Sequence, residues 1–146
     1  MTVKAASIDE LREQLRAAGL RVTASRVAVL GSLHRNVTPR AHGEITEELA
    51  PDGWDRATVY RILTDFVEAG LVRRADLGDH VWRFEILRPE TRHETADHPH
   101  FMCNECGDVT CLPDESVRIA PARGAPKAMR KKGLEIQVRG RCDRCA

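Results

Sequence analysis

Residues 56–85 read RATVYRILTDFVEAGLVRRADLGDHVWRFE, and the two halves of this stretch follow different patterns. In the first half, apolar residues recur at intervals of three and four, which predicts a helix with one buried face. These residues are Val59, Ile62, Leu63, Phe66 and Val67. Asp55 can cap this helix and Gly70 can end it. The second half contains two short alternating runs around Gly78-Asp79, which predict a β-hairpin.

Three shorter helices are predicted before this stretch. Ser7 followed by Glu10 is a capping-box pattern that begins a first helix, and Gly19 ends it. Thr23 can cap a second helix, and Thr38-Pro39 would place proline at the first position of a third. Three or four short helices followed by a small hairpin are typical of a winged helix, a DNA-binding helix-turn-helix with a hairpin as its wing.

The polar face of the 56–69 helix carries Arg56, Tyr60, Arg61 and Thr64. A solvated helix surface would explain these residues. A helix with two arginines and a tyrosine in its N-terminal half is better suited to the major groove, where arginine binds guanine or phosphate. The net charge of the whole chain is only +1 and gives no such signal. Residues 1–40, however, contain seven basic and three acidic side chains.

Two Cys-x-x-Cys pairs lie in HPHFMCNECG, residues 98–107, and RCDRC, residues 141–145. Four thiolates from two such pairs fit the tetrahedral shell of zinc. The sequence therefore predicts a structural Zn²⁺ on Cys103, Cys106, Cys142 and Cys145, and a small domain that folds only with its metal. Unligated core cysteines are one alternative, and a thioredoxin-type redox pair, for which the βαβ pattern is absent, is another.

A second metal site is suggested by the histidines before the first cysteine pair. On an extended strand His98 and His100 face the same side, so both imidazoles can reach one ion. Neutral imidazole suits Zn, Fe, Ni or Cu. Nearby side chains that could complete such a site are Cys111, Glu85, His93, His80 and His42. A pair of exposed histidines without a metal is the alternative.

The stretch 86–97, ILRPETRHETAD, contains proline and many charges without periodicity, so we expect a hinge there. It would separate a domain at residues 1–85 from a zinc-stabilised domain at residues 98–146. In the second domain, HFMCNECGDVTCL predicts a pair of strands, residues from Lys127 to Lys132 predict one short helix, and GLEIQVRGRC predicts a returning strand.

The location and the class of the protein are also constrained. No segment approaches the roughly 20 apolar residues of a membrane span, and the N-terminus has no secretion pattern, so we expect a cytoplasmic protein. We do not expect an enzyme, because the sequence contains no catalytic triad or phosphate-binding loop. His42-Gly43-Glu44 with Cys103-x-x-Cys106 matches the zinc deaminase signature only superficially, since Met102 replaces its proline.

These motifs together resemble the ferric uptake regulator family, the metal-responsive bacterial repressors that include iron, zinc, nickel and peroxide sensors. Those that match are GLRVTASRVAVL, RATVYRILTDFVEAGLV, RFE, HPHFMCNECGDV and GRCDRC, in this order. The resemblance implies an α+β chain with an N-terminal winged-helix DNA-binding domain and a small C-terminal α/β dimerisation domain that contains the four-cysteine zinc site. It also implies a homodimer that binds AT-rich inverted repeats in double-stranded DNA, with no membrane and no small organic substrate as partner.

The resemblance also implies roles for individual residues. Tyr60 and Arg61 match the DNA-contacting TVYR of the family, and Arg21 matches a basic residue that reaches toward the minor groove. With Arg56 and Thr58, these are the expected DNA contacts. The resemblance further implies that Glu85, His98 and His100 bind the regulatory metal.

The departures from the family pattern concern regulation. Thr38-Pro39 stands where a ligand histidine usually begins a helix, His42 comes a turn later, and the longer hinge contains His93. Cys111 replaces the usual acidic ligand. Sulfur favours zinc over manganese or ferrous iron, so we expect a zinc-responsive repressor, with Fe²⁺ or Mn²⁺ as possible effectors. An iron or peroxide sensor, and a zinc-stabilised DNA-binding protein without a working regulatory site, remain the alternatives.

Overall fold

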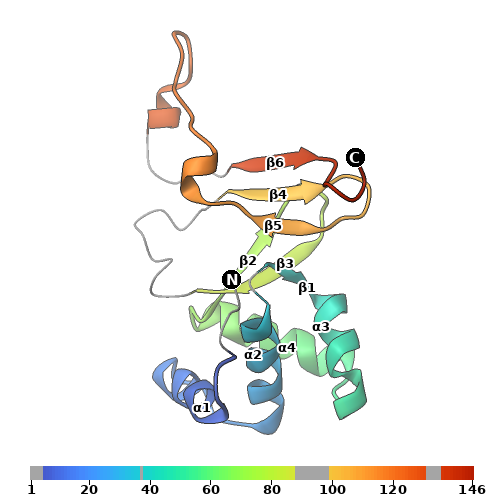
Figure 1. Ribbon diagram of the computed structural model, residues 1–146. Coiled ribbons are helices and arrows are strands. Elements are labelled where there is room, and N and C mark those ends of the chain that lie inside the picture. Colours follow the sequence, from blue (N-terminus) through green and yellow to red (C-terminus); the bar gives the residue numbers. More distant parts are fainter. Residues whose placement is uncertain (1–4, 37, 88–98, 131–135) are drawn as a thin grey trace. The chain divides into compact units, whose positions relative to one another are not determined.

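The computed structural model describes residues 5–36, 38–87, 99–130 and 136–146. The chain divides into two compact units, Met1–Leu87 and Arg88–Ala146. Figure 1 shows helices and a small sheet in the first unit, and a second small sheet in the other. No helix among the described residues is long and apolar enough to cross a membrane.

The first unit contains four α-helices: α1 (Ile8–Ala17), α2 (Ala24–Arg35), α3 (His42–Leu49) and α4 (Arg56–Glu68). The predicted caps are confirmed. Ser7 and Glu10 form a capping box on α1, and the Thr23 side chain accepts a hydrogen bond from the backbone of Arg26 in α2. At α4, the Asp55 carboxylate accepts a hydrogen bond of 2.6 Å from the Thr58 N–H. Each cap satisfies a backbone donor that the helix leaves without a partner.

The core of this unit forms where the four helices meet the sheet. The apolar stripe of α4 faces the core as predicted, with Val59, Leu63 and Phe66 without solvent exposure and Val67 partly buried against them. Leu15, Leu30, Ile45 and Phe84 from the other elements complete the same cluster. A salt bridge of 2.8 Å between Arg26 and Asp65 also joins α2 to α4. The packing therefore fixes the buried face of α4, and its polar face is directed outward.

The segment between α3 and α4 is the turn of a helix-turn-helix. It contains the 3₁₀ turn η1 (Ala50–Asp52), which ends at Gly53. Gly53 has a φ of +85°, in the left-handed region where a side chain would be strained. This turn lets α4 start in a new direction soon after α3 ends.

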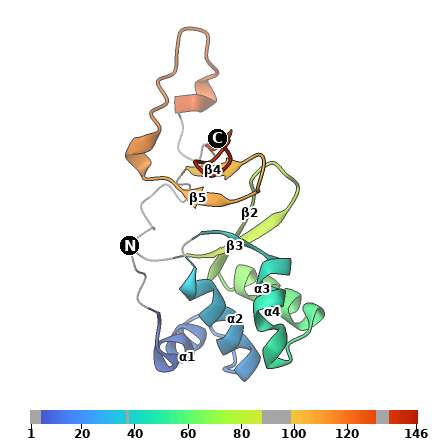
Figure 2. The ribbon, with the colours of Figure 1, turned by 45° about the vertical axis from the view of Figure 1, so that its right-hand side comes forward.

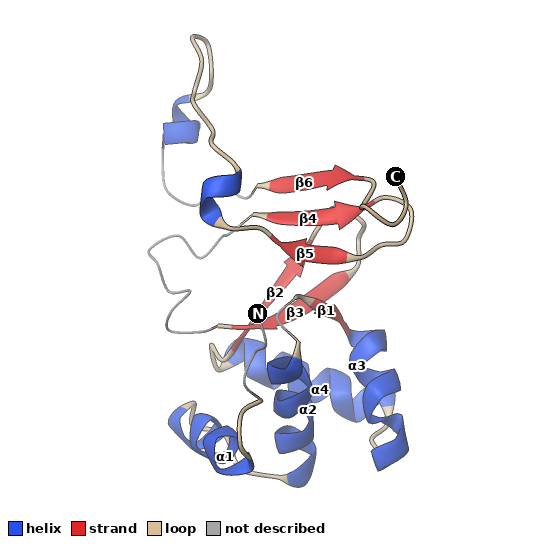
Figure 3. Cartoon of the chain, viewed as in Figure 1, coloured by secondary structure: helices blue, strands red, loops and turns tan. Residues whose placement is uncertain are grey.

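The sheet of the first unit has the strand order β1-β3-β2, with β1 (Arg40–Ala41), β2 (Val72–Asp76) and β3 (Trp82–Ile86). β2 and β3 form the predicted hairpin, and the Asp76 carboxylate accepts backbone hydrogen bonds from Gly78 and His80 at its turn. Figure 3 shows this hairpin beside the helices of the unit. Helices followed by a hairpin wing make this unit a winged helix.

The predicted start of the third helix at Thr38-Pro39 is wrong. Arg40 and Ala41 are extended and pair with Phe84 and Arg83 of β3, so α3 begins only at His42. Two interactions hold this segment. The backbone of Arg40 and Ala41 pairs with β3, the central strand of the sheet, and the Arg40 guanidinium forms a salt bridge with Glu48 on α3.

The second unit has a sheet of strand order β5-β4-β6, formed by β4 (His100–Cys103), β5 (Val109–Cys111) and β6 (Gln137–Gly140). β4 is antiparallel to β5 and parallel to β6. Two 3₁₀ turns, η3 (Asp114–Ser116) and η4 (Lys127–Arg130), follow β5, and residues 112–130 extend away from this sheet in Figures 1 and 2. The predicted short helix is thus a 3₁₀ turn over Lys127–Arg130, and its last two positions lie outside the described residues.

Candidate functional site

The four cysteines of the two Cys-x-x-Cys pairs lie together in the second unit. Their sulfur atoms are all within 4.8 Å of one another, and the Sγ atoms of Cys106 and Cys142 are 3.7 Å apart. Four sulfurs about 2.3 Å from a tetrahedral zinc ion are separated by about 3.8 Å. The spacing therefore fits zinc.

The local structure explains why these cysteines meet. In the first loop, the Gly107 N–H donates to the Cys103 carbonyl at 3.0 Å, and Gly107 has a φ of +73°, which favours glycine. In the second loop, the Cys145 N–H donates to the Cys142 carbonyl at 2.9 Å. The parallel pairing of Cys103 with Gly140 then places the second loop beside the first.

The pKa values of the clustered cysteines are shifted in opposite directions. Backbone N–H groups of Cys106 and Cys142 lower the pKa of Cys103 to about 6. In contrast, the hydrogen bonds that Cys145 makes with the sulfurs of Cys142 and Cys106 raise its pKa to about 12. One thiolate is thus stabilised by the backbone, but four crowded thiolates repel one another. A bound Zn²⁺ would remove this repulsion and deprotonate all four.

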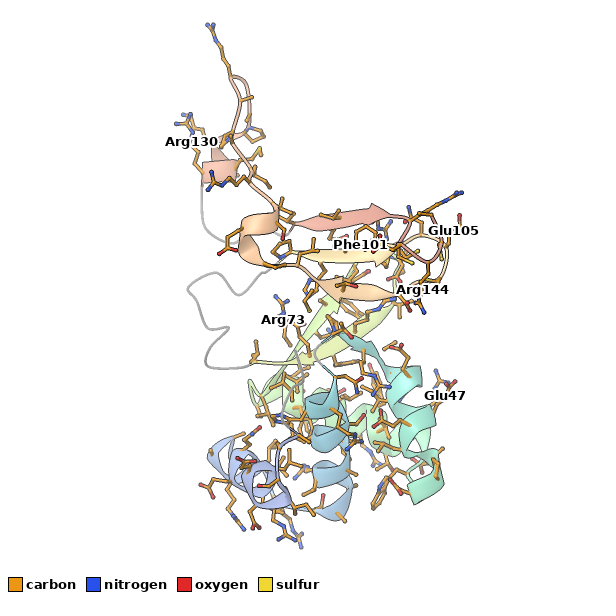
Figure 4. The ribbon with its side chains drawn as sticks, in the orientation of Figure 1. Glu47, Arg73, Phe101, Glu105, Arg130 and Arg144 are labelled. Carbon is orange, nitrogen blue, oxygen red and sulfur yellow. The ribbon has the colours of Figure 1, made fainter. Side chains whose placement is uncertain are left out.

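Two salt bridges link the loops around the four sulfurs. Arg141 lies 3.2 Å from the Glu105 carboxylate, and Arg144 pairs with Asp108. Glu105 and Arg144 are labelled at the same end of this sheet in Figure 4. Because all four side chains are largely exposed, these pairs contribute little to stability. Each pair connects a residue of the first cysteine loop with a residue of the second.

His100 and Cys111 form a second group of potential ligands in the same unit. They are directly opposite each other on β4 and β5, and an imidazole nitrogen of His100 lies within 4.8 Å of the Cys111 sulfur. His100 is 5% exposed, and Cys111 is partly buried. The strand pairing therefore brings together two of the predicted regulatory ligands. Two others, His98 and His93, lie outside the described residues.

Glu85 lies on β3 of the first unit, opposite Arg73 of β2. The two side chains form a salt bridge of 2.8 Å and are both largely buried, with 13% and 17% of their surfaces exposed. Figure 4 labels Arg73 on this hairpin. The sequence alone did not identify Arg73 as a partner of Glu85, because this pairing depends on the register of the hairpin.

His42 and His80 occupy different surroundings. His42 begins α3, its Nε2 lies 2.9 Å from the Arg56 carbonyl oxygen, and its ring packs edge-to-face with the Tyr60 ring. His80 lies in the exposed turn of the wing, 3.7 Å from the Asp76 carboxylate. The first histidine is therefore part of the α3–α4 contact, and the second is part of the hairpin turn.

The expected DNA contacts lie on the surface of the first unit. Arg56, Tyr60 and Arg61 are exposed on the N-terminal half of α4, and Tyr60 is 47% exposed. Thr58 is partly buried, and its N–H is used by the Asp55 cap. Arg21 is exposed before α2, and its carbonyl accepts a hydrogen bond from the Arg26 guanidinium. This arrangement leaves two arginines and a tyrosine of α4 accessible to a partner.

Comparison with known proteins identifies the fold and the family. A model of the ferric uptake regulator family matches residues 17–138. The peroxide-responsive repressor PerR of Staphylococcus aureus is 35% identical over 115 residues, which cover 75% of this chain and 73% of PerR. The crystal structure of the Vibrio cholerae ferric uptake regulator is 27% identical with a TM-score of 0.68, and the match covers 90% of this chain and 98% of that one.

A zinc uptake regulator complexed with zinc and DNA shares the fold, with a TM-score of 0.59 at 18% identity over 94% of this chain and 91% of that one. The predicted combination of a winged-helix domain and a small α/β domain with four clustered cysteines is confirmed. The chain belongs to the ferric uptake regulator family of metal-responsive transcriptional regulators.

Proposed function

We propose that this protein is a homodimeric, metal-dependent transcriptional repressor that binds double-stranded DNA through α4. The observation that carries the proposal is the exposure of Arg56, Tyr60 and Arg61 on α4 while the opposite face of the helix is buried. As a DNA-binding regulator it would act in the cytoplasm, without enzymatic activity and without a small organic substrate.

The DNA contacts follow from the chemistry of these side chains. Arginine forms bidentate hydrogen bonds with guanine or binds phosphate, and the tyrosine ring can contact base edges or thymine methyl groups. Arg21 would bind in the minor groove beside them, and Thr58 would contact the backbone. A homodimer presents two copies of α4, which favours an inverted repeat, and we expect this repeat to be AT-rich.

A structural Zn²⁺ held by Cys103, Cys106, Cys142 and Cys145 is the second part of the proposal. The four sulfurs have the spacing that such an ion requires. The zinc would join β4 to the loop after β6, and so stabilise the unit that we expect to dimerise.

The third part is a regulatory metal bound by His100, Cys111, His98 and Glu85, with His93 as a further candidate. His100 and Cys111 supply one imidazole and one sulfur from neighbouring strands. This pair of donors favours zinc over the harder Fe²⁺ and Mn²⁺. The ion would act as a switch if it binds the DNA-competent state more tightly, and a coupling of about 1 to 3 kcal/mol is enough.

One specific observation favours an iron or peroxide sensor instead. PerR of S. aureus, a peroxide-responsive repressor, is 35% identical to this chain. In that case Cys111 would stay outside the metal shell, and histidines and carboxylates would hold Fe²⁺. A protein with no working regulatory site is a further alternative, since Thr38-Pro39 replaces the usual ligand histidine.

The test is DNA binding by the zinc-retaining protein, measured by fluorescence anisotropy with an AT-rich inverted-repeat duplex. The protein is titrated separately with Zn²⁺, Mn²⁺ and anaerobic Fe²⁺, and an Arg61→Ala variant serves as the control for the contact face. A gain in affinity with zinc alone supports the proposal, and a gain with Fe²⁺ alone supports the alternative. Tight binding that ignores all three metals excludes a regulatory site.

A further inference from the structure

We propose that His42 is a positioning residue for DNA recognition, because it holds the Tyr60 ring and the first turn of α4 in one orientation. The inference rests on the proposed function, in which Tyr60 contacts DNA. It gives His42 a role on the DNA-binding side of the protein, in which the hydrogen bond to Arg56 occupies its Nε2.

The first contact is a hydrogen bond between the N-terminal residues of α3 and α4. His42 is the first residue of α3, and its Nε2 lies 2.9 Å from the carbonyl oxygen of Arg56, the first residue of α4. A carbonyl oxygen only accepts hydrogen bonds, so Nε2 carries the proton and donates it. The same carbonyl accepts the helical hydrogen bond from the N–H of Tyr60, four residues later, and its two lone pairs allow both.

The second contact is between the two rings. The centroids of the His42 and Tyr60 rings are 5.3 Å apart with an angle of 61° between the planes, an edge-to-face arrangement. Such an arrangement is favoured by the charge distribution of aromatic rings. Tyr60 is 47% exposed, so the remaining part of its ring faces solvent. His42 therefore supports one side of a tyrosine whose other side is available to DNA.

These contacts matter because an exposed side chain without support samples several rotamers. Ordering such a side chain on binding costs free energy, and a contact that orders it beforehand reduces this cost. His42 acts on both the backbone and the ring of the same recognition residue. The arrangement also explains why His42 is a poor metal ligand through Nε2, since coordination there would break the bond to Arg56.

The first test does not require DNA. Tyr60 is the only tyrosine in the chain, so protein labelled with 3-fluorotyrosine gives one ¹⁹F resonance that reports on this ring. The matched control is His34, whose Nε2 lies 2.8 Å from the Gln14 side chain between α2 and α1. We expect the resonance to move in His42→Ala and to stay unchanged in His34→Ala. An unchanged resonance in His42→Ala would overturn the inference.

The second test is a double-mutant cycle for binding to the AT-rich inverted-repeat duplex. We expect His42→Ala to weaken binding by about 2- to 10-fold, and this loss to be clearly smaller in a Tyr60→Ala background, where only the hydrogen bond to the Arg56 carbonyl is left to lose. His42→Phe keeps a ring against Tyr60 and should recover part of the affinity. The zinc content and the midpoint of the regulatory metal titration should not change.

Two results would overturn the inference even if the variants fold. One is an equal loss of affinity in the Tyr60→Ala background, which would place the effect elsewhere. The other is a metal midpoint displaced by more than about 10-fold, the size expected for a metal ligand or its support. The wild-type protein could also fail to bind the duplex while the ¹⁹F resonance still moves in His42→Ala. That result would contradict the proposed function but confirm the contact between His42 and Tyr60.

Discussion

His100 and Cys111 are directly opposite each other on the antiparallel strands β4 and β5. The neighbouring pair, Pro99 and Leu112, is joined by a backbone hydrogen bond of 2.8 Å. Because hydrogen-bonded and non-hydrogen-bonded pairs alternate along antiparallel strands, His100 and Cys111 form a non-hydrogen-bonded pair, in which side chains are closest. An imidazole and a thiol held in this way are a partial metal site.

We therefore predict that Cys111→Ser weakens zinc binding at the proposed regulatory site by about 10- to 100-fold, because a soft ligand is replaced by a poor one. Cys111→Asp, which restores an oxygen ligand, should shift the preference toward Mn²⁺ or Fe²⁺. The measurement is competition with a chromophoric zinc chelator, using protein that retains its structural zinc. Thr110→Ser, next to Cys111 on the exposed side of β5, is the control. Unchanged zinc affinity in Cys111→Ser would remove the basis for zinc as the effector.

Arg73 should oppose the proposed binding of a metal ion by Glu85. Its guanidinium forms a 2.8 Å salt bridge with that carboxylate in a largely buried position, so a metal ion has to compete with it. We expect Arg73→Gln to tighten the regulatory site while lowering the unfolding free energy of the metal-free protein by about 1 to 3 kcal/mol. Isothermal titration and urea denaturation measure the two effects.

Arg74→Gln is a matched control for this pair. Arg74 is adjacent on β2 but exposed, and its guanidinium lies 4.2 Å from the centre of the Trp82 ring. Its loss should cost about 0.5 to 1 kcal/mol of stability and leave metal affinity unchanged. Weaker metal binding in Arg73→Gln would mean that Arg73 supports Glu85 as a ligand.

The Arg73–Glu85 pair also shows where sequence reasoning ends. A hairpin centred between Gly78 and Asp79 pairs Arg73 with Phe84, whereas the observed register is centred on Asp79 and pairs it with Glu85. A change of one residue moves every side chain of the strand to the other face. The hairpin could therefore be predicted from its alternating pattern, but its salt bridge could not.

Local signals predicted the elements that depend on local interactions. The stripe and caps of α4 are encoded within one helix, and the paired cysteines imply a shared ion by their chemistry alone. The strand Arg40–Ala41 depends instead on pairing with residues more than 40 positions later, so the nearby proline misled the prediction. The contact of His42 with Tyr60 is also non-local, because it joins two different helices.

Removal of the proposed structural zinc should unfold the second unit selectively. The four sulfurs cluster near the ends of β4 and β6, and the described residues of this unit bury few apolar side chains, Met102 and Cys103 among them. We expect Cys142→Ser to lose zinc and to abolish hydrogen-exchange protection in β4, β5 and β6, while α2 and α4 stay protected. Cys111→Ser is the control, and it should retain both the zinc and the hydrogen-exchange protection of these strands. Retained protection without zinc would contradict a structural role for the ion.

Glu48 should make the first unit sensitive to acid. Burial raises the pKa of Glu48, but hydrogen bonds from Arg35, Arg40 and Ser32 outweigh it and hold the pKa below the usual 4.5. A carboxyl with a lowered pKa stabilises the fold fully above its unfolded pKa of 4.5, and this stabilisation is lost as the pH falls through the folded pKa. We therefore expect the unfolding free energy to fall below about pH 4.5.

Glu48→Gln isolates this contribution. The variant should lose about 1 to 3 kcal/mol at neutral pH, because two arginines lose a charged partner, and it should show a weaker dependence on pH between about 3 and 5. Urea denaturation followed by tryptophan fluorescence reports on the correct unit, since the chain has two tryptophans, Trp54 and Trp82, and both lie in it. Glu47→Gln, on the exposed side of α3, is the matched control. Equal acid sensitivity in the wild type and Glu48→Gln would show that other carboxyls cause the loss, because the lowered pKa of Glu48 requires a difference between them.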